Sequence, residues 1–340
     1  MTYSIFAINA NALSESGCSA YTYTLNGFLP YLRGPWFQFS EQQVDDPSLN
    51  GETKPAFPFI TGAGGAEQVV LFGLLGIRTD QPVLYMNPSL PPQILYLKAQ
   101  KFYYAGATLM ASMNSTHTLL TRHATPSTMG FTDKYSNVSF PLTIGTPNSP
   151  SSSDLHFNIA VNETVAIPNR MYWHTTTTDG NLLQCRPVSS SDAYAPGQFP
   201  LAALDGATAT RWQPASNATA SMVVDMTGIP AQALASISFD WGARPPVNVT
   251  VFLGNSTSGM GTSGEEEIVI EVDGVAPDLP YDAVKVAESS MSVVSVEGNT
   301  TTVVVEGGAW TGDYVRLEIE GCWEKDGAGA TVGEFVLIGA

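Results

Sequence analysis

The pattern of apolar residues changes at about residue 81, and this change limits the folds open to the chain. In residues 1–33 apolar side chains recur at helical spacing, which predicts two helices, the second ending near Pro30. From Gln81 onward they gather in short β-branched and aromatic runs separated by turn residues, as in antiparallel sandwiches. The sequence therefore predicts a helical beginning followed by all-β domains.

The predicted strands form two groups on either side of a linker at Val188–Ser191 and Pro196, and a surface loop is expected at Ser258–Glu267. The first group comprises Val83–Met86, Ile94–Lys98, Lys101–Tyr104, Thr118–Arg122, Phe140–Ile144 and Leu155–Val161. The second comprises Met222–Asp225, Ile237–Trp241, Val249–Leu253, Ile268–Val272, Val293–Val296, Thr302–Val305, Tyr314–Ile319 and Glu334–Ile338.

Length and charge exclude several classes of protein. A chain of 340 residues can hold two or three domains, and its 44% of hydrophobic residues indicates a globular protein. The formal charge of −17, with only 14 Lys and Arg, argues against nucleic acid or an anionic membrane as partner. No apolar run approaches the roughly 20 residues of a membrane helix, so no membrane span is predicted.

Seven Asn-X-Ser/Thr sequons favour passage through a secretory pathway, although accidental sequons in Ser/Thr-rich loops are the alternative. They lie at Asn114, Asn137, Asn162, Asn217, Asn248, Asn255 and Asn299. The first residues, Met1–Ile5, lack the basic and apolar regions of a signal peptide. Sequons typical of a secreted protein, in a sequence that lacks a signal peptide, predict that this chain is a fragment or comes from a truncated gene model.

Three cysteines and four histidines give no metal-binding spacing. Cys18 lies in a helical pattern and is expected to be a buried thiol, whereas Cys185 and Cys322 bracket the last domain and could close it with a disulfide. The histidines are expected to be ordinary surface or half-buried residues: His117, His123, His156 and His174.

The stretch Gly34–Arg78 is the densest in functional residue types. Residues 34–65 show no period and are rich in Pro, Gly and aromatics, and a loop of that length is uncommon unless it is functional. Gly62, Gly64 and Gly65 then lead into Ala66–Ile77, which is apolar on nearly all sides and predicts a buried helix.

Four segments of the first 110 residues resemble fungal acid trehalases of glycoside hydrolase family 65: FAINANALSESGCSAYTY, PWFQFSEQQVDD, PAFPFITGAGGAEQVVLFGLLGIR and NPSLPPQILYLKAQKFYYAGATL. The resemblance implies that residues 1–80 are the last helices of an (α/α)6 barrel and that 81–190 form the family's small β-sandwich domain. It also implies hydrolysis of α,α-trehalose to glucose with inversion, by two carboxylates on opposite faces of the sugar and without a cofactor.

Glu41 is the candidate general base, because Ser40-Glu41-Gln42 is similar to the base motif of glucoamylases. Trp36 and Phe37 could stack on sugar or shield the carboxylate, and Gln38 and Gln42 could bind sugar hydroxyls. A solvated loop carboxylate is the alternative for Glu41, and the same loop offers three further candidates for the base: Asp45, Asp46 and Glu52.

A glycine-rich turn is predicted at Thr61–Gly65, and it is open to two interpretations. It could present backbone N–H groups to substrate, chiefly at Thr61 and Gly62, or its glycines could allow close helix packing. The segment Phe57–Ala63 lacks the His found in phosphate sites of the family's phosphorylases, which favours hydrolysis. Glu67 is expected to stabilise the start of the helix that follows.

The family's general acid lies N-terminal to every segment matched here. The resemblance therefore implies that this chain alone is inactive and needs the preceding part of the parent enzyme as partner.

Residues 198–340 form the third predicted domain. Leu201–Trp212 is similar to the A-x-D-G-x-x-x-T-x-W signature of discoidin-type, galactose-binding-like sandwiches. Similar domains often hold a structural Ca²⁺, and the matching residues here are Asp205, Thr210 and Glu334. A turn held by the Asp side chain without metal is the alternative, and Trp212 is expected in the core.

Together these observations predict a multidomain C-terminal portion of a trehalase-type hydrolase, secreted, in the cell wall or vacuolar in its parent. Two alternatives remain: a non-catalytic carbohydrate-binding or adhesion protein, and a hydrolase or phosphorylase for another α-linked glucose disaccharide.

Overall fold

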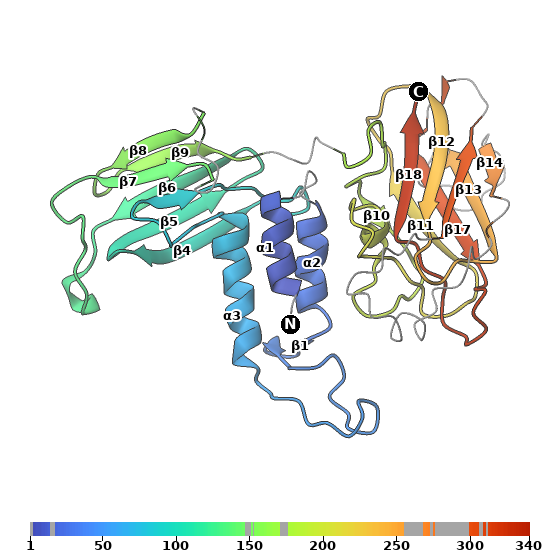
Figure 1. Cartoon of the computed structure of the whole chain (residues 1–340), viewed down its shortest axis with the longest axis horizontal. Coiled ribbons are helices and arrows are strands. Elements are labelled where there is room, and N and C mark those ends of the chain that lie inside the picture. Colours follow the sequence, from blue (N-terminus) through green and yellow to red (C-terminus); the bar gives the residue numbers. More distant parts are fainter. Residues whose placement is uncertain are drawn as a thin grey trace, which may run out of the picture. The chain divides into compact units, whose positions relative to one another are not determined.

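The computed structural model describes residues 3–13, 18–146, 151, 153–170, 176–254, 268–272, 275, 299–305, 309–310 and 312–340. The chain divides into two compact units, residues 1–175 and 176–340 (Figure 1). Each unit contains two packed β-sheets, and the α-helices belong to the first unit. The predicted change from helices to strands is confirmed; the finer division at residues 80, 190 and 198 stays a prediction.

Helices α1 (Tyr3–Leu13) and α2 (Cys18–Phe28) pack together, and α1 also packs on α3 (Ile60–Gln68) and on the π-helix that continues α3 over Val69–Leu74. The two predicted N-terminal helices are thus confirmed. The buried Asn11 amide donates to the carbonyls of Gly73 at 2.8 Å and Ser89 at 3.2 Å. Arg170 donates to the carbonyls of Asn11 and Ala12, which satisfies the C-terminal end of α1.

The structure corrects the expected start of the third helix. Thr61–Gly65 lies inside α3, so the predicted glycine-rich turn is wrong. A Cβ on Gly65 would lie 2.9 Å from the Ser4 hydroxyl oxygen, which shows that the glycine lets α3 approach α1 closely. Glu67 lies near the end of α3, so its expected interaction with a helix N-terminus is also wrong.

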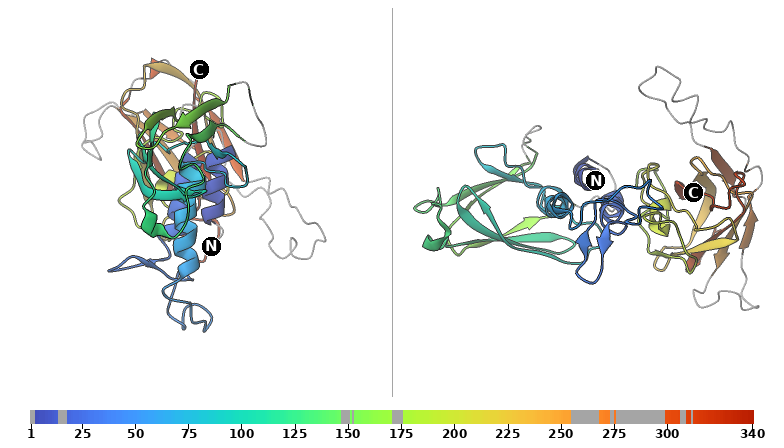
Figure 2. Two further views of the ribbon diagram at one scale, coloured as in Figure 1. Left: turned by 90° about the vertical axis from the view of Figure 1, so that its left-hand side faces the viewer. Right: turned by 90° about the horizontal axis from the view of Figure 1, so that it is seen from below.

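Between α2 and α3 the chain forms a short hairpin and a long loop. Strand β1 (Leu32–Arg33) pairs antiparallel with β2 (Gln38–Phe39), and residues 40–59 then form a loop that extends away from the helices (Figure 2). This loop carries the predicted catalytic residue Glu41, its alternatives and Gln42, whereas the other predicted sugar-binding residues lie in the hairpin or at the start of α3.

The sandwich of the first unit has a three-stranded and a four-stranded sheet. In the first, β3 (Leu84–Met86) runs parallel to β7 (Phe140–Ile144), and β8 (Leu155–Ile159) completes the sheet. The second is an antiparallel sheet in the order β4 (Leu97–Tyr104), β5 (Ala107–Met113), β6 (His117–His123) and β9 (Thr164–Pro168). Leu74, Leu75 and Ile77 enter the same buried core and tie the helices to the sheets.

The second unit contains two further sheets. One has the order β10 (Val188–Ser189), β11 (Ala220–Asp225), β17 (Tyr314–Glu320), β13 (Asn248–Gly254) and β14 (Ile268–Glu271). In the other, β12 (Gln232–Asp240) pairs with β15 (Thr300–Val304), β16 (Ala309–Trp310) and β18 (Glu334–Gly339). Trp212 is fully buried between these sheets, as predicted. Two 3-10 helices, Ser127–Met129 and Pro200–Ala203, lie in connections.

All the predicted strands overlap strands of the structure, apart from Val293–Val296, which lies outside the described residues. Strands β1, β2, β5, β9 and β16 were not predicted, and part of the expected linker forms β10. The Ser258–Glu267 loop and His174 also lie outside the described residues. Among those that are described, no helix is long and apolar enough to cross a membrane.

The cysteine prediction is wrong. Cys18 and Cys185 are disulfide-bonded, whereas Cys322 is a free thiol buried in the core of the second unit. With its side chain packed among apolar residues, Cys322 behaves as a small hydrophobic residue.

The sequons differ in accessibility. The asparagines at 114, 137, 162, 217 and 248 are exposed, and Asn255 lies outside the described residues. Asn299 is 7% exposed and its amide donates to the Gly242 carbonyl at 2.9 Å, so the folded unit has no room for a glycan there.

A buried ion pair provides a test of the first unit. Arg122 is fully buried; it donates to the Asp133 carboxylate at 3.1 Å and to the carbonyls of Val138, Ile159 and Tyr135. Asp133→Ala should lower the free energy of unfolding by about 3–5 kcal/mol, because it leaves a buried charge without its counterion. The matched change Glu318→Ala, at the partly exposed Arg316 pair, should cost about 0–1 kcal/mol. Equal losses for both in urea unfolding would contradict this interpretation.

Candidate functional site

Glu41 lies at the stem of the long loop, where two chain segments run side by side. Its backbone N–H donates to the Ala56 carbonyl at 3.1 Å, and the Ala56 N–H donates to the Glu41 carboxylate at 2.9 Å. Just beyond, the Phe59 N–H donates to the Phe39 carbonyl at 2.7 Å. The side chain is exposed but held by this contact, so one carboxylate has a fixed position and remains open to water. Such a group can accept a proton from an attacking water.

Arg33 connects the hairpin to the loop. Its guanidinium donates to the Asp45 carboxylate at 2.6 and 3.2 Å and to the carbonyls of Gln42 and Gln43 at 2.8 Å. The Ser40 hydroxyl donates to Asp45 at 2.5 Å. These contacts fix the residues on both sides of Glu41. The sequence analysis missed Arg33, since no local pattern marks a cation that bonds to carbonyls ten residues away.

Two other carboxylates of the loop, those of Asp45 and Asp46, accept hydrogen bonds from nearby residues. Hydrogen bonds from Arg33 first, and from Ser40, lower the pKa of Asp45. Hydrogen bonds from the Ser48 hydroxyl and backbone lower the pKa of Asp46. Both carboxylates are thus stabilised in their charged forms by side chains of the hairpin and the loop. Glu52 is exposed at a left-handed backbone position, with φ of 63°.

The predicted sugar-binding residues lie around the same loop. Trp36 and Phe37 are 82% and 72% exposed between β1 and β2, next to the exposed Gln38. The Gln42 side-chain oxygen accepts a hydrogen bond from Thr53 at 2.8 Å. Stacking on sugar by the two aromatics stays a prediction; neither shields Glu41, whose side chain is exposed.

At the start of α3, the two predicted backbone donors differ. Thr61 is exposed. Gly62 is buried and its N–H donates to the Phe59 carbonyl at 3.0 Å, so this amide is not open to a substrate.

In the second unit the predicted calcium ligands do lie together. Asp205, Thr210 and Glu334 are 0%, 3% and 8% exposed. The Thr210 hydroxyl donates to both Asp205 oxygens at 2.9 and 2.8 Å, and the Ala207 N–H donates to Asp205 at 2.9 Å. Burial, and then the charge of Asp205, raise the pKa of Glu334 well above its usual value, with a further contribution from Asp240; the Gly206 and Ala207 N–H groups oppose this rise.

This cluster fits both interpretations of the sequence. The buried Oε1 of Glu334 has no hydrogen-bond partner among the described residues, and hard carboxylate oxygens are what Ca²⁺ prefers. Conversely, Thr210 and Ala207 already hold Asp205, as in a turn that needs no metal. Within the described part of the chain, no group of three His, Cys, Asp or Glu could hold a metal ion, so a calcium site here would need backbone oxygens as well.

The role of Asp45 can be tested through pH. Because its folded pKa is lowered, its contribution is fully present above the unfolded value near 3.8 and is lost as the pH falls through the folded pKa. Asp45→Asn should therefore make the loop several times more susceptible to pepsin than the unsubstituted loop at pH 5, and this ratio should fall toward one as the pH is lowered. Glu52→Gln, in the same loop, is the matched control and should leave this ratio near one. A ratio for Asp45→Asn that does not vary with pH would contradict the assignment.

Comparison with known proteins places these features in context. No protein-family model matches the chain. Acid trehalase of Emericella nidulans is 39% identical and covers 100% of the chain, which matches 33% of that enzyme. Cell wall acid trehalase of Arthroderma benhamiae is 37% identical over 99% of the chain and 34% of its own length. The chain thus spans about a third of the length of these curated relatives.

Solved structures give a weaker likeness. Chitosan-binding module 1 of a Paenibacillus chitosanase/glucanase is 19% identical and covers 47% of this chain and 98% of the module, with a TM-score of 0.33. A fucose-binding module of Streptococcus pneumoniae is 11% identical over 46% of this chain and 96% of the module, with a TM-score of 0.28. Scores this low support no argument about this chain.

The curated relatives also agree on location. A third, the periplasmic/secreted acid trehalase of Candida glabrata, is 30% identical over 74% of the chain and 22% of its own length. Cell-wall, periplasmic and secreted relatives support an extracellular or cell-wall location for this chain, which agrees with its exposed sequons. Over its whole length, this chain is a homologue of fungal acid trehalases.

Proposed function

We propose that this chain is the C-terminal portion of a trehalase-type inverting glycoside hydrolase. In this proposal residues 1–80 supply the last helices of an (α/α)6 barrel and one rim of its active site. Glu41 is the general base that activates water, and the general acid lies in sequence that this chain does not contain. The chain alone is then catalytically incomplete, and trehalose is the substrate of the whole enzyme.

The exposed apolar surface of the helices and loop is the observation that carries this proposal. Of the 24 exposed large hydrophobic side chains in the described residues, ten lie within residues 1–60. These side chains are close together in sequence, and exposed apolar side chains that gather into a patch mark an interface. Further barrel helices would cover them. The ten are Ile5, Phe6, Leu13, Leu29, Trp36, Phe37, Val44, Leu49, Phe57 and Ile60.

The loop chemistry agrees with this proposal. Inverting glycosidases need a carboxylate fixed opposite the acid, with space for a water between them. Glu41 is fixed by the Ala56 N–H and its side chain is open to water. Trp36, Phe37 and Gln38 could contact sugar at the same rim.

A chimaera tests this assignment. The matching third of the Emericella nidulans enzyme is replaced by this chain, and glucose release from trehalose is measured. Glu41→Gln should lower kcat by about 10²–10⁴-fold, because the neutral amide cannot accept the proton of water. Glu52→Gln, on the same loop, should change it little. This chain alone should release no glucose.

Near-normal turnover of the Glu41→Gln chimaera would remove Glu41 from the site, and trehalose hydrolysis by this chain alone would overturn its incompleteness. Other α-linked glucose disaccharides, assayed with and without phosphate, distinguish a trehalase from a related hydrolase or phosphorylase. A chimaera that is folded and inactive on all of them would favour a non-catalytic carbohydrate-binding protein.

A structural Ca²⁺ in the second unit is a separate proposal. It rests on the buried Glu334 oxygen that has no hydrogen-bond partner among the described residues, beside Asp205 and Thr210. A cation there would offset the repulsion between the two carboxylates. It has a structural role and takes no part in the proposed hydrolysis.

Thermal unfolding of this chain tests the calcium proposal. With a Kd of about 10⁻⁴ M, 10 mM Ca²⁺ should stabilise the second unit by about 2.7 kcal/mol relative to chelator-treated protein. Glu334→Gln should abolish this stabilisation by Ca²⁺, since a neutral amide is a weaker ligand for the ion than a carboxylate. Asp225→Asn, at a carboxylate hydrogen-bonded to Thr227 instead, should keep it. A melting temperature that does not respond to Ca²⁺ would favour the turn without metal.

A further inference from the structure

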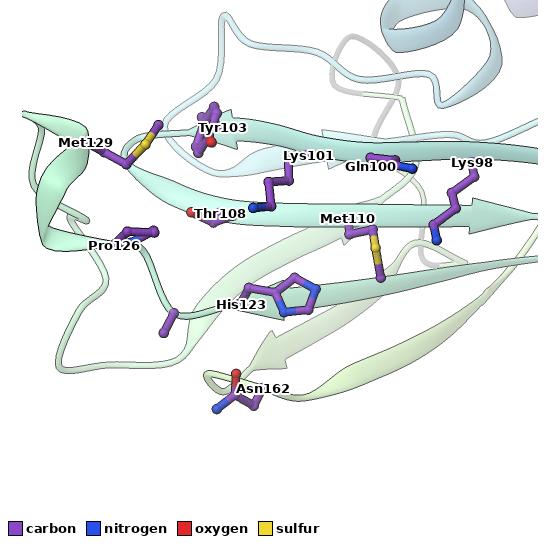
Figure 3. A pocket seen from close by; sticks show the side chains of 11 residues that line it. Lys98, Gln100, Lys101, Tyr103, Thr108, Met110, His123, Pro126, Met129 and Asn162 are labelled. Atoms are coloured by element: carbon purple, nitrogen blue, oxygen red, sulfur yellow. The ribbon is translucent and has the colours of Figure 1, made fainter.

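The outer face of the four-stranded sheet in the first unit contains a groove of about 520 Å³ (Figure 3). It crosses β4, β5 and β6 and reaches Asn162 in the connection between β8 and β9. Lys98, Gln100, Lys101 and Tyr103 line it from β4, and His123 lines it from β6. The groove lies on the opposite face of this sheet from the buried core side chains, such as Phe102 and Leu109.

A β-bulge in β4 gives the groove its polar side chains. Ala99 pairs with Ala111 and Phe102 with Leu109, so Gln100 and Lys101 together lie opposite the single residue Met110. Both are exposed, whereas a regular strand would turn one of them into the core. Bulges commonly re-aim side chains at functional sites. Here the bulge places Lys101 on the same face as Lys98, and Figure 3 shows both side chains extending over β5.

The charge of the groove is opposite to that of the chain. The whole sequence carries 31 Asp and Glu against 14 Lys and Arg, yet none of the eleven residues lining the groove is acidic. Within the described residues, neither Lys98 nor Lys101 has an ion-pair or hydrogen-bond partner. Two lysines that are attached roughly 10 Å apart along one strand are therefore available to an anionic ligand.

We propose that this groove binds an acidic polysaccharide, with Lys98 and Lys101 pairing with carboxylates on alternate sugar units, because a single sugar unit is shorter than the distance between the two lysines along the strand. Tyr103 is 43% exposed and offers an aromatic surface to a sugar ring. Gln100 offers an amide that both donates to and accepts from hydroxyl groups, as does Asn162 when it carries no glycan. The groove is open, as a polymer chain requires, and it lies outside the proposed hydrolytic site. It does not depend on the trehalase proposal.

Other polyanions fit these observations less well. Nucleic acid carries one phosphate for about every 3.4 Å of each strand, a denser row of charge than two lysines in the groove can neutralise. An acidic peptide would use the lysines but not the combination of an aromatic surface with amides. A sugar polymer with spaced carboxylates uses both.

Isothermal titration of the full chain, produced without N-glycans because Asn162 lies in a sequon at the rim, tests this proposal. The probes are tetragalacturonic acid, neutral maltotetraose and tetraphosphate at one ionic strength. Tetragalacturonic acid should bind and the other two should not. Lys98→Ala and Lys101→Ala should each weaken binding about tenfold or more, and added salt should weaken it further.

Lys325→Ala is the matched control, since it removes one exposed lysine from the second unit. It should leave the affinity unchanged, and the thermal melting of all three variants should match that of the original chain. Absence of tetragalacturonic acid binding, or an equal loss in all three variants, would overturn the proposal. If maltotetraose bound equally well, recognition of the ligand's charge would be contradicted. If tetraphosphate bound equally well, recognition of the sugar would be contradicted.

Discussion

The join between the helices and the first sandwich determines where the candidate site lies. The Asn11 side chain bonds to the carbonyls of Gly73 and Ser89, so the end of α1, the π-helix and the segment before β4 are held at one buried point. The next apolar residues along the chain, Leu74, Leu75 and Ile77, belong to the same core as the sheets of the first unit. The α3 and π-helix segment is therefore held in the core at its C-terminal end, whereas its first residue, Ile60, is exposed and directly follows the long loop.

Rigidity along the loop then depends on polar contacts. Arg33 bonds to Asp45 and to two carbonyls, and the Ala56 N–H holds Glu41. A carboxylate that must act on a water needs its position fixed to a fraction of an ångström, and exposed loops alone seldom provide this. The Arg33 contacts hold the segments on both sides of Glu41, while the aromatic side chains of the hairpin remain exposed.

Most of the strands could be predicted from the sequence because a half-buried strand has a period of two residues and ends at turn residues. The helical start of α3 could not, because Gly62, Gly64 and Gly65 have low helix propensity and read as a turn. Their place in a helix depends on the approach of Ser4 to Gly65, a contact between segments 61 residues apart in sequence. The cysteine pairing failed for a similar reason, since spacing along the chain does not determine which thiols meet.

The residues of the candidate sites also differ in whether the sequence could reveal them. Motif similarity brought Asp205, Thr210 and Glu334 together correctly, because all three are fixed by one fold. It could not find Arg33, or the bulge that turns Lys101 outward, since both depend on pairing between distant residues. Side chains whose role depends on the backbone of another segment are those that a single sequence does not reveal.

The exposure of Glu41 is the last constraint on function. A general base and a general acid work at one pH only when their surroundings separate their pKa values, and water-filled surroundings do not. In this chain the Glu41 carboxylate is open to solvent, while Trp36, Phe37 and Phe57 of the same region expose apolar surface. Covering that surface with further helices would exclude water from the apolar groups and narrow the space around the carboxylate in one step. Association of the helices with the remainder of a barrel would thus both stabilise them and complete the electrostatic environment that the reaction requires.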